Sequence, residues 1–174
     1  MSIESIKSAI RAIPDYPKKG ILFRDITTLL QDPEAFSEII DIMAERYKDN
    51  PPTKIIGIES RGFIFGVALA YKLGIGFVPV RKKGKLPYKT YEASYELEYG
   101  TAVVEIHTDA LTSDDRVVII DDLLATGGTA VAAVSLVDKF NAEIVSIDFV
   151  VELISLNGRA KLQKYPVSTV VAYD

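Results

Sequence analysis

The stretch from Val117 to Thr129, with the sequence VVIIDDLLATGGT, constrains the fold of this chain more than any other segment. Its four leading β-branched residues predict a buried strand. The adjacent carboxylates of Asp121 and Asp122 follow, and a turn of small residues then leads into a predicted helix. A strand, a tight turn and a helix in this order are the unit that builds parallel α/β sheets. In such sheets, ligands bind outside the carboxyl ends of the strands.

The rest of the chain alternates strands and helices with short connections, as a parallel sheet requires. Helices are predicted over residues 3–13, 33–47, 62–73, 128–140 and 155–163, the second with Asp32 as its N-cap. Strands are predicted over residues 54–58, 76–80, 116–120, 143–151 and 168–172. Residues 90–106 are expected to form a β-hairpin turning at Gly100, and residues 15–26 a turn-rich connection. The expected fold is α/β, a mostly parallel twisted sheet with helices on both faces, in a single domain over residues 1–174.

Composition excludes several classes of site and partner. The 174 residues include no cysteine, which excludes disulfides, thiolate metal sites and a cysteine nucleophile. The single histidine, His107, argues against a zinc site or a serine triad. The net charge of −4 argues against nucleic-acid binding, and the sequence lacks the pattern of a signal peptide or a membrane span. We therefore expect a cytoplasmic protein with no nucleic-acid and no membrane partner.

The turn after the two acids has the chemistry of a phosphate site. Gly127 and Gly128 let backbone amides approach an anion, and the helix behind them offers the positive end of its dipole. The two acids would repel a phosphate but suit the vicinal hydroxyls of a ribose, directly or through Mg²⁺. The segment therefore predicts a site for a phosphorylated ribose. The alternative is a strand–turn–helix joint whose acids are merely solvated. The pattern is neither a nucleotide P-loop nor a dinucleotide fingerprint.

Two further segments suit anions. The one dense basic run of this acidic chain lies at residues 81–85, RKKGK, and favours phosphate binding over the alternative of a solvated loop. Residues 59–62, ESRG, end a predicted strand and open a helix, which is again a geometry that receives anions. Arg61 there faces an anion, a base or, in the plainer alternative, solvent. On residue chemistry alone, Glu98 is one exposed glutamate among many and Phe23 a core residue.

Taken together, these segments resemble the type I phosphoribosyltransferases, and in particular those that act on adenine. The matching blocks cover nearly the whole chain, at residues 20–25 (GILFRD), 59–63 (ESRGF), 81–87 (RKKGKLP), 97–100 (LEYG) and 121–129 (DDLLATGGT). The resemblance implies transfer of ribose 5-phosphate from 5-phosphoribosyl-1-pyrophosphate (PRPP) to adenine, giving AMP and pyrophosphate, with Mg²⁺ as the cofactor. It also implies a homodimer, a base-recognising hood within residues 1–33 and a flexible hairpin lid.

The resemblance assigns a role to each matching residue. The ribose and its 5-phosphate would be bound by Asp121, Asp122, Ala125, Thr126, Gly127, Gly128 and Thr129. The pyrophosphate would be bound by Ser60, Arg61, Arg81, Lys82 and Lys85. Adenine would be bound by Leu22, Phe23, Arg24 and Leu123, with Phe23 and Leu123 on either side of the ring. Glu98 would manage the N9 proton, Tyr99 would help to close the lid, and Arg61 completes the catalytic set. Mg²⁺ would be held mainly through PRPP, aided by Asp121 or Asp122.

Two rival functions remain open at this point. The first is transfer to another purine, against which the hood and the LEYG block argue. The second is a non-catalytic regulator that senses PRPP, which would require an added DNA-binding module. One departure from the resemblance is the sequence Tyr88-Lys89 after the basic run, where many relatives place a small residue. We expect this change to affect the mobility of the loop and not the reaction.

Overall fold

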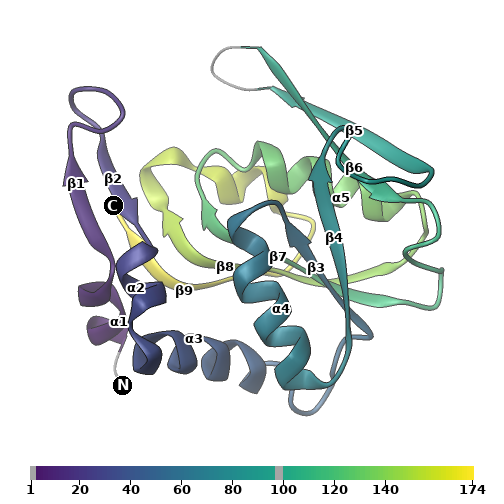
Figure 1. Cartoon of the computed structure of the whole chain (residues 1–174), viewed down its shortest axis with the longest axis horizontal. Helices are drawn as coiled ribbons and strands as arrows, with labels where there is room; N and C mark the ends of the chain where they lie inside the picture. The colour runs from purple at the N-terminus through teal and green to yellow at the C-terminus, as the bar shows by residue number, and fades with distance from the viewer. Residues whose placement is uncertain (1–2, 97–99) are drawn as a thin grey trace.

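A seven-stranded sheet in the order β5-β6-β4-β3-β7-β8-β9 forms the centre of the computed structural model, which describes residues 3–96 and 100–174 (Figure 1). Five strands pair in parallel: β4 (Gly76–Lys82), β3 (Lys54–Ile58), β7 (Arg116–Leu124), β8 (Glu143–Leu153) and β9 (Val167–Tyr173). At one edge, β6 (Thr101–His107) runs antiparallel to β4, and β5 (Thr90–Glu96) runs antiparallel to β6. The mostly parallel sheet and the hairpin are thus confirmed.

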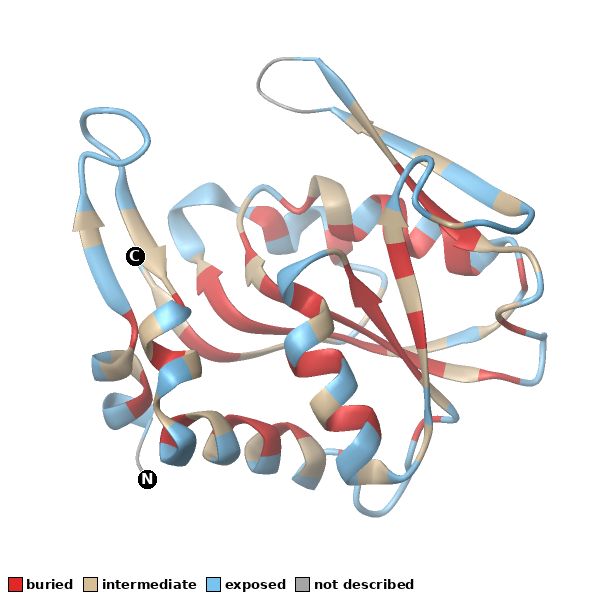
Figure 2. Ribbon diagram, viewed as in Figure 1, coloured by how far each residue is buried: buried red, intermediate tan, exposed pale blue. Residues whose placement is uncertain are grey.

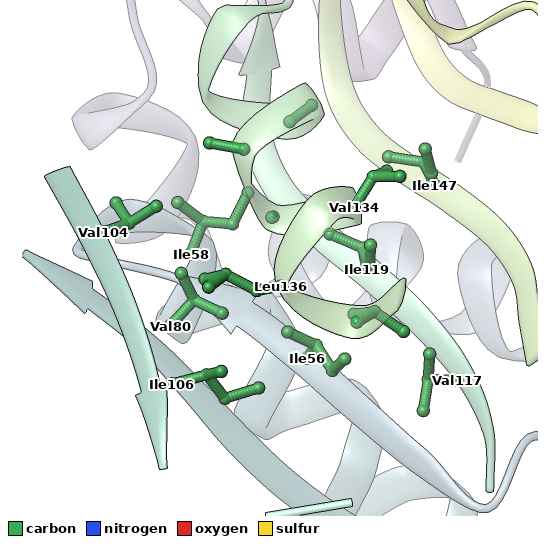
Figure 3. Close-up of a cluster of buried hydrophobic side chains, with 14 of the residues drawn as sticks. Ile56, Ile58, Val80, Val104, Ile106, Val117, Ile119, Val134, Leu136 and Ile147 are labelled. Carbon is green, nitrogen blue, oxygen red and sulfur yellow. The ribbon is translucent and has the colours of Figure 1, made fainter. Parts of the chain in front are cut away.

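Helices cover both faces of this sheet. The helices α1 (Ile3–Ala9), α2 (Thr27–Gln31), α3 (Pro33–Glu45) and α4 (Arg61–Leu73) contribute to one buried cluster, and α5 (Gly128–Asp138) to the other. Neighbouring residues of β7 divide between the two: Val117 and Ile119 pack beneath α5, whereas Val118 and Ile120 pack beneath the other helices. This alternation follows from the two-residue period of a strand. Figure 3 shows the cluster on the α5 side of the sheet. Figure 2 shows that much of the central strands is buried.

The N-terminal region differs from the prediction. The first helix ends at Ala9, and the expected final turn is instead β1 (Arg11–Pro14). It pairs antiparallel with β2 (Leu22–Asp25), which lies inside the expected turn-rich connection. The two strands form a separate ribbon, the hood, beside the main sheet (Figure 1). Helical spacing of isoleucines was the local signal, but pairing with a strand eleven residues away overrides it.

Other element boundaries shift for identifiable reasons. Asp32 caps α3 as predicted, its carboxylate accepting from the backbone amides of Glu34 and Ala35 at 3.0 and 3.1 Å. The strand β7 continues to Leu124 because β8 pairs with it up to Glu152. The helix predicted over residues 155–163 is two 3₁₀ turns, η1 (Ile154–Leu156) and η2 (Gly158–Leu162). Within the described ranges, no helix is long and apolar enough to cross a membrane.

Candidate functional site

The carboxyl ends of β3, β4 and β7 meet at a cavity of about 310 Å³. Its lining consists of Glu59, Ser60, Arg61, Lys82, Tyr95, Asp121, Asp122 and Thr129. Residues 59–61 and the acidic pair about sixty positions later are therefore brought to one place, because parallel strands direct their carboxyl ends to the same edge of a sheet. Of the residues predicted to bind pyrophosphate, Ser60, Arg61 and Lys82 lie here beside the acidic pair.

The predicted phosphate loop forms a smaller hollow of about 70 Å³ next to this cavity. Residues 123–130, Asp121 and Phe149 line it. Gly127 is the residue before the first turn of α5 and adopts φ +78°, a left-handed conformation that glycine reaches without strain. The first-turn amides of a helix have no acceptor within the helix and carry its positive dipole end. The hollow at the start of α5 is therefore built to receive an anion.

The acidic pair is held at the end of β7 at an electrostatic cost. Asp122 is only 4% exposed, and its Oδ2 lies 2.7 Å from Nε of Arg61. Burial raises the pKa of Asp122, although the charge of Arg61 opposes the shift. Burial, and next the charge of Asp122, raise the pKa of Asp121 well above its usual value. Two adjacent carboxylates beside one guanidinium disfavour each other's charge, and hydrogen bonds from the hydroxyls of a bound sugar would favour the charged forms.

The segment between β3 and α4 positions Arg61 beneath these acids. The Glu59–Ser60 peptide bond is cis, and α4 begins immediately afterwards at Arg61. Gly62 follows because the end of β7 leaves no room for a side chain: a Cβ there would lie 2.7 Å from the carbonyl oxygen of Ile120 and 3.0 Å from Oδ1 of Asp121. The start of α4 and the end of β7 are thus in backbone contact at the acidic pair.

Two predicted pyrophosphate ligands lie outside the cavity lining. The guanidinium of Arg81 faces Glu59, with Nε–Oε2 and Nη2–Oε1 distances of 3.2 and 3.1 Å, and it also donates to the carbonyl oxygen of Lys85. This pairing with Arg81 is the main cause that lowers the pKa of Glu59. The backbone amide of Lys85 donates to Glu105. Arg81 therefore lies near the end of β4 and Lys85 in the loop that follows, and each donates a hydrogen bond to an acid of the same chain.

Sequence reasoning missed the two acids that shape this basic loop. Glu59 also accepts from the backbone amide of Lys82 at 3.0 Å. Glu105, only 3% exposed, accepts from the amides of Lys85 and Leu86 at 2.9 and 2.8 Å. Burial alone would raise the pKa of Glu105, but these backbone amides outweigh it and the pKa is lowered. The available signal was a single carboxylate between the apolar Val104 and Ile106 of a strand.

The predicted adenine ligands lie mainly in the hood. Phe23 of β2 packs edge-to-face on Tyr16, with ring centroids 5.2 Å apart. The guanidinium of Arg24 stacks over the ring of Tyr173 at 3.8 Å, which fastens the hood to β9. Leu22 is 48% exposed, and Leu123 lines the phosphate hollow. The structure therefore distributes this set between the hood and the end of β7, and the stacking of a base between Phe23 and Leu123 stays a prediction.

The hairpin of β5 and β6 contributes one described residue, Tyr95, to the lining of the cavity. Glu98 and Tyr99 lie outside the described residues. Tyr95 of β5, to which the sequence motifs gave no role, lines the cavity. Its ring also approaches the start of α5, since a Cβ on Gly128 would lie 3.6 Å from Cδ2 of Tyr95. His107 ends β6, and its Nε2 accepts from the backbone amide of Tyr88 at 3.4 Å.

The acidic pair suits a metal ion that arrives with its substrate. Among the described residues, no group of three or more histidine, aspartate or glutamate side chains is placed to hold a metal ion by itself. Asp121 and Asp122 provide two adjacent carboxylates next to the anion-binding hollow. Mg²⁺ commonly binds through one or two carboxylates together with substrate phosphates. The donor set therefore fits Mg²⁺ held mainly by the substrate.

A parallel sheet that presents an adjacent acidic pair, a glycine turn at a helix start and a basic segment at one edge is an arrangement that can be compared with known families. The sequence model of the family described as the phosphoribosyl transferase domain matches residues 25–171. The chain belongs to this phosphoribosyltransferase family.

Individual relatives narrow the comparison. The adenine phosphoribosyltransferase of Solidesulfovibrio magneticus is 58% identical over 160 residues, which are 92% of this chain and 94% of that protein. The crystal structure of adenine phosphoribosyltransferase from Thermoanaerobacter pseudethanolicus matches with a TM-score of 0.94 at 50% identity, over 99% of this chain and 100% of that one. The Saccharomyces cerevisiae enzyme, complexed with D-2,5-dideoxy-2,5-imino-altritol 1,6-bisphosphate and adenine, matches with a TM-score of 0.92 at 42% identity, over 97% and 98% of the two chains. The type I fold expected from the motifs is confirmed.

Proposed function

We propose that this chain is an adenine phosphoribosyltransferase, which transfers the 5-phosphoribosyl group of PRPP to N9 of adenine and releases AMP and pyrophosphate. The observation that carries the proposal is the convergence of Arg61, Lys82 and the Asp121–Asp122 pair at one cavity beside the phosphate hollow. Relatives of this name that are 50% or more identical over nearly the whole chain support the choice of adenine.

Each part of PRPP has a counterpart in the chain. The loop at residues 125–129 and the start of α5 hold the 5-phosphate. Asp121 and Asp122 accept from the ribose hydroxyls, and Ser60, Arg61 and Lys82 hold the pyrophosphate. When bound, Mg²⁺ supplies positive charge next to the phosphate oxygens of PRPP. As the C1′–oxygen bond to pyrophosphate breaks, negative charge develops on the leaving group and is stabilised by the cations of the site.

The second half of the reaction forms the bond between C1′ and N9. Adenine presents an N6 donor and an N1 acceptor, a pattern that a strand such as β2 can match with one C=O and one N–H. A 6-oxopurine presents the reverse pattern and would leave buried groups unpaired. Glu98 takes the proton that N9 loses. The hairpin lid, including Tyr99, excludes water while C1′ carries positive charge.

The role of Glu98 predicts a specific kinetic defect. In Glu98→Ala, PRPP retains all its ligands while N9 loses its proton acceptor, so kcat is expected to fall by about 100-fold or more with the KM for PRPP nearly unchanged. Steady-state kinetics with PRPP and adenine varied separately would measure both. Glu96→Ala, two residues earlier on the same hairpin, is the matched control. Equal losses in kcat and in PRPP affinity would contradict a role in proton transfer.

The functional unit in this proposal is a cytoplasmic homodimer. An apolar row, Ile64, Val67 and Tyr71, lies exposed on one side of α4, and exposed apolar patches are typical of protein interfaces. The lack of cysteine suits a reducing compartment. The basic run at residues 81–85, which includes Arg81, would then serve the site of the neighbouring subunit as well as that of its own subunit.

Dissociation of the dimer is expected to reduce activity. Val67→Glu places a charge in the apolar row and should give monomers with a lower rate per chain, as should dilution of the wild type. Sedimentation velocity and initial rates at matched concentrations would measure both properties. Ile3→Glu, at a similarly exposed apolar residue of α1, is the control. Monomers with the full specific rate would refute a site shared between subunits.

The proposed function is tested by offering PRPP and Mg²⁺ with adenine, hypoxanthine, guanine or xanthine in separate reactions. AMP from adenine alone, lost on chelation of the metal and restored by added Mg²⁺, is the expected result. Turnover of an oxopurine would retain the ribose site but overturn the assignment of the base. Binding of PRPP without product from any base would favour a regulator over an enzyme.

A further inference from the structure

The phosphate loop packs against a second turn of the chain with no space between the two backbones. Gly158 begins η2 and is buried against residues 124–127. A Cβ on Gly158 would lie 2.9 Å from Cδ1 of Leu124 and 3.0 Å from the backbone nitrogen of Gly127, and it would overlap the carbonyl oxygen of Ala125. Conversely, a Cβ on Gly127 would lie 2.7 Å from the carbonyl oxygen of Gly158. Each glycine thus has the other segment as its neighbour.

The turn that carries Gly158 is itself fixed to the sheet. Arg159 pairs with Glu152 of β8 through two hydrogen bonds, from Nε at 2.9 Å and from Nη2 at 2.5 Å, and Nη1 donates to the carbonyl oxygen of Val167 at 2.7 Å. Thr169 of β9 donates to the same carboxylate at 3.3 Å. Glu152 is 8% exposed, and its pKa is lowered chiefly by these bonds from Arg159. A bidentate pair of this kind restricts direction as well as distance.

We propose that Gly158 is a positioning residue for the 5-phosphate of PRPP, and that the Arg159–Glu152 pair anchors it. The inference rests on the proposed function. Leu124, Ala125 and Gly127 line the hollow on one side and contact Gly158 on the other. Any side chain at residue 158 must push these backbone groups, and with them the amides that face the phosphate. The backbone of Ala125 and Gly127 cannot yield as the end of a flexible side chain would, so the displacement is transmitted to the site.

Gly158→Ala is expected to raise the KM for PRPP by about 10-fold to 100-fold, because small misplacements of binding groups cost affinity on that scale. The KM for adenine, measured with PRPP saturating, should remain near the wild-type value, since the atoms nearest to a Cβ at residue 158 belong to residues 124–127 and not to the hood. Calorimetry with ribose 5-phosphate, which carries the phosphate but no base, should show a loss of affinity of similar size. Gly76→Ala is the matched control, because a Cβ there meets only Cγ of Lys54 at 3.6 Å.

Arg159→Lys tests the anchor and also replaces Gly158→Ala should the latter not fold. It keeps the charge but loses the two-pronged contact, and a smaller rise in the KM for PRPP is expected, again without a change in the KM for adenine. Unchanged affinity for PRPP and ribose 5-phosphate in folded variants, or equal losses for PRPP and adenine, would overturn the proposal. A wild-type protein that makes no AMP would refute the proposed function instead, while the calorimetric comparison with ribose 5-phosphate would still decide the role of Gly158.

Discussion

Replacing Asp121 and Asp122 together by asparagine is expected to abolish measurable binding of PRPP. Each carboxylate is assigned a hydrogen bond from a ribose hydroxyl, and a bond to a charged group contributes about 1.5–3 kcal/mol. Loss of both corresponds to about 3–6 kcal/mol, or about 100-fold to 10,000-fold in affinity. The two asparagines also remove the anionic ligands that we assign to Mg²⁺. Calorimetric titration with PRPP, with and without Mg²⁺, would measure the loss.

The same double variant should be more stable than the wild type at neutral pH. Both aspartates have a pKa raised in the folded protein, so folding favours their protonated forms. The wild type therefore loses stability as the pH rises above the unfolded-state pKa of about 3.9, and it keeps that stability below it. Asparagine does not titrate, so its advantage in urea denaturation should grow as the pH rises from about 4 through the raised pKa values of the folded protein.

Asp109→Asn with Asp114→Asn is the matched control, since it removes the same charge from two exposed aspartates between β6 and β7. This control should leave PRPP affinity nearly unchanged. Intact PRPP binding in the Asp121/Asp122 variant would disprove the assignment of the acidic pair to the ribose. A gain in stability without a loss of PRPP binding would indicate that the acidic pair destabilises the fold for a reason other than binding the ribose.

The phosphate loop could be predicted because its chemistry and its local structure lie in one contiguous segment. The β-branched run before Asp121, the two acids and the paired glycines specify the strand, the ligand groups and the turn without distant contacts. Arg61 could similarly be placed at a strand end, because it lies between the predicted strand at residues 54–58 and the predicted helix at residues 62–73. Parallel topology then brought these segments to one edge of the sheet, and this too follows from the alternation of elements.

The features that escaped prediction depend on contacts between distant residues. No local signal predicts that β1 will pair with β2. Nor does one predict that Glu59 will accept hydrogen bonds from both the side chain of Arg81 and the backbone amide of Lys82. The close contact of Gly158 with Gly127 joins segments thirty residues apart. In sequence, Gly158 resembles any turn glycine, and only the fold reveals what occupies the place of its missing side chain.

Gly62→Ala is expected to damage the same site from the opposite side of β7. The added methyl group would press on the carbonyl oxygen of Ile120 and on Oδ1 of Asp121. The carbonyl belongs to the central strand and cannot move away, so α4 must shift and carry Arg61 with it. Insertion of a methyl group into a closely packed region costs about 1–3 kcal/mol of stability. The larger effect should be on PRPP, with a KM raised by about 100-fold, because Arg61 is displaced from Asp122.

Gly66→Ala separates damage to the site from damage to the packing of α4. Gly66 is also buried on this helix, but a Cβ there would meet Cε2 of Phe77 at 2.9 Å, a side chain that does not line the cavity. This control should lose some stability, offset in part by the higher helix propensity of alanine, and keep its KM for PRPP. Kinetics and urea denaturation of both variants would distinguish the two effects. If the KM for PRPP rises in proportion to lost stability in both, the close approach at Gly62 serves packing alone. If it rises only in Gly62→Ala, the absence of a side chain at residue 62 is a requirement of the ribose site, imposed through the backbone of Ile120 and Asp121.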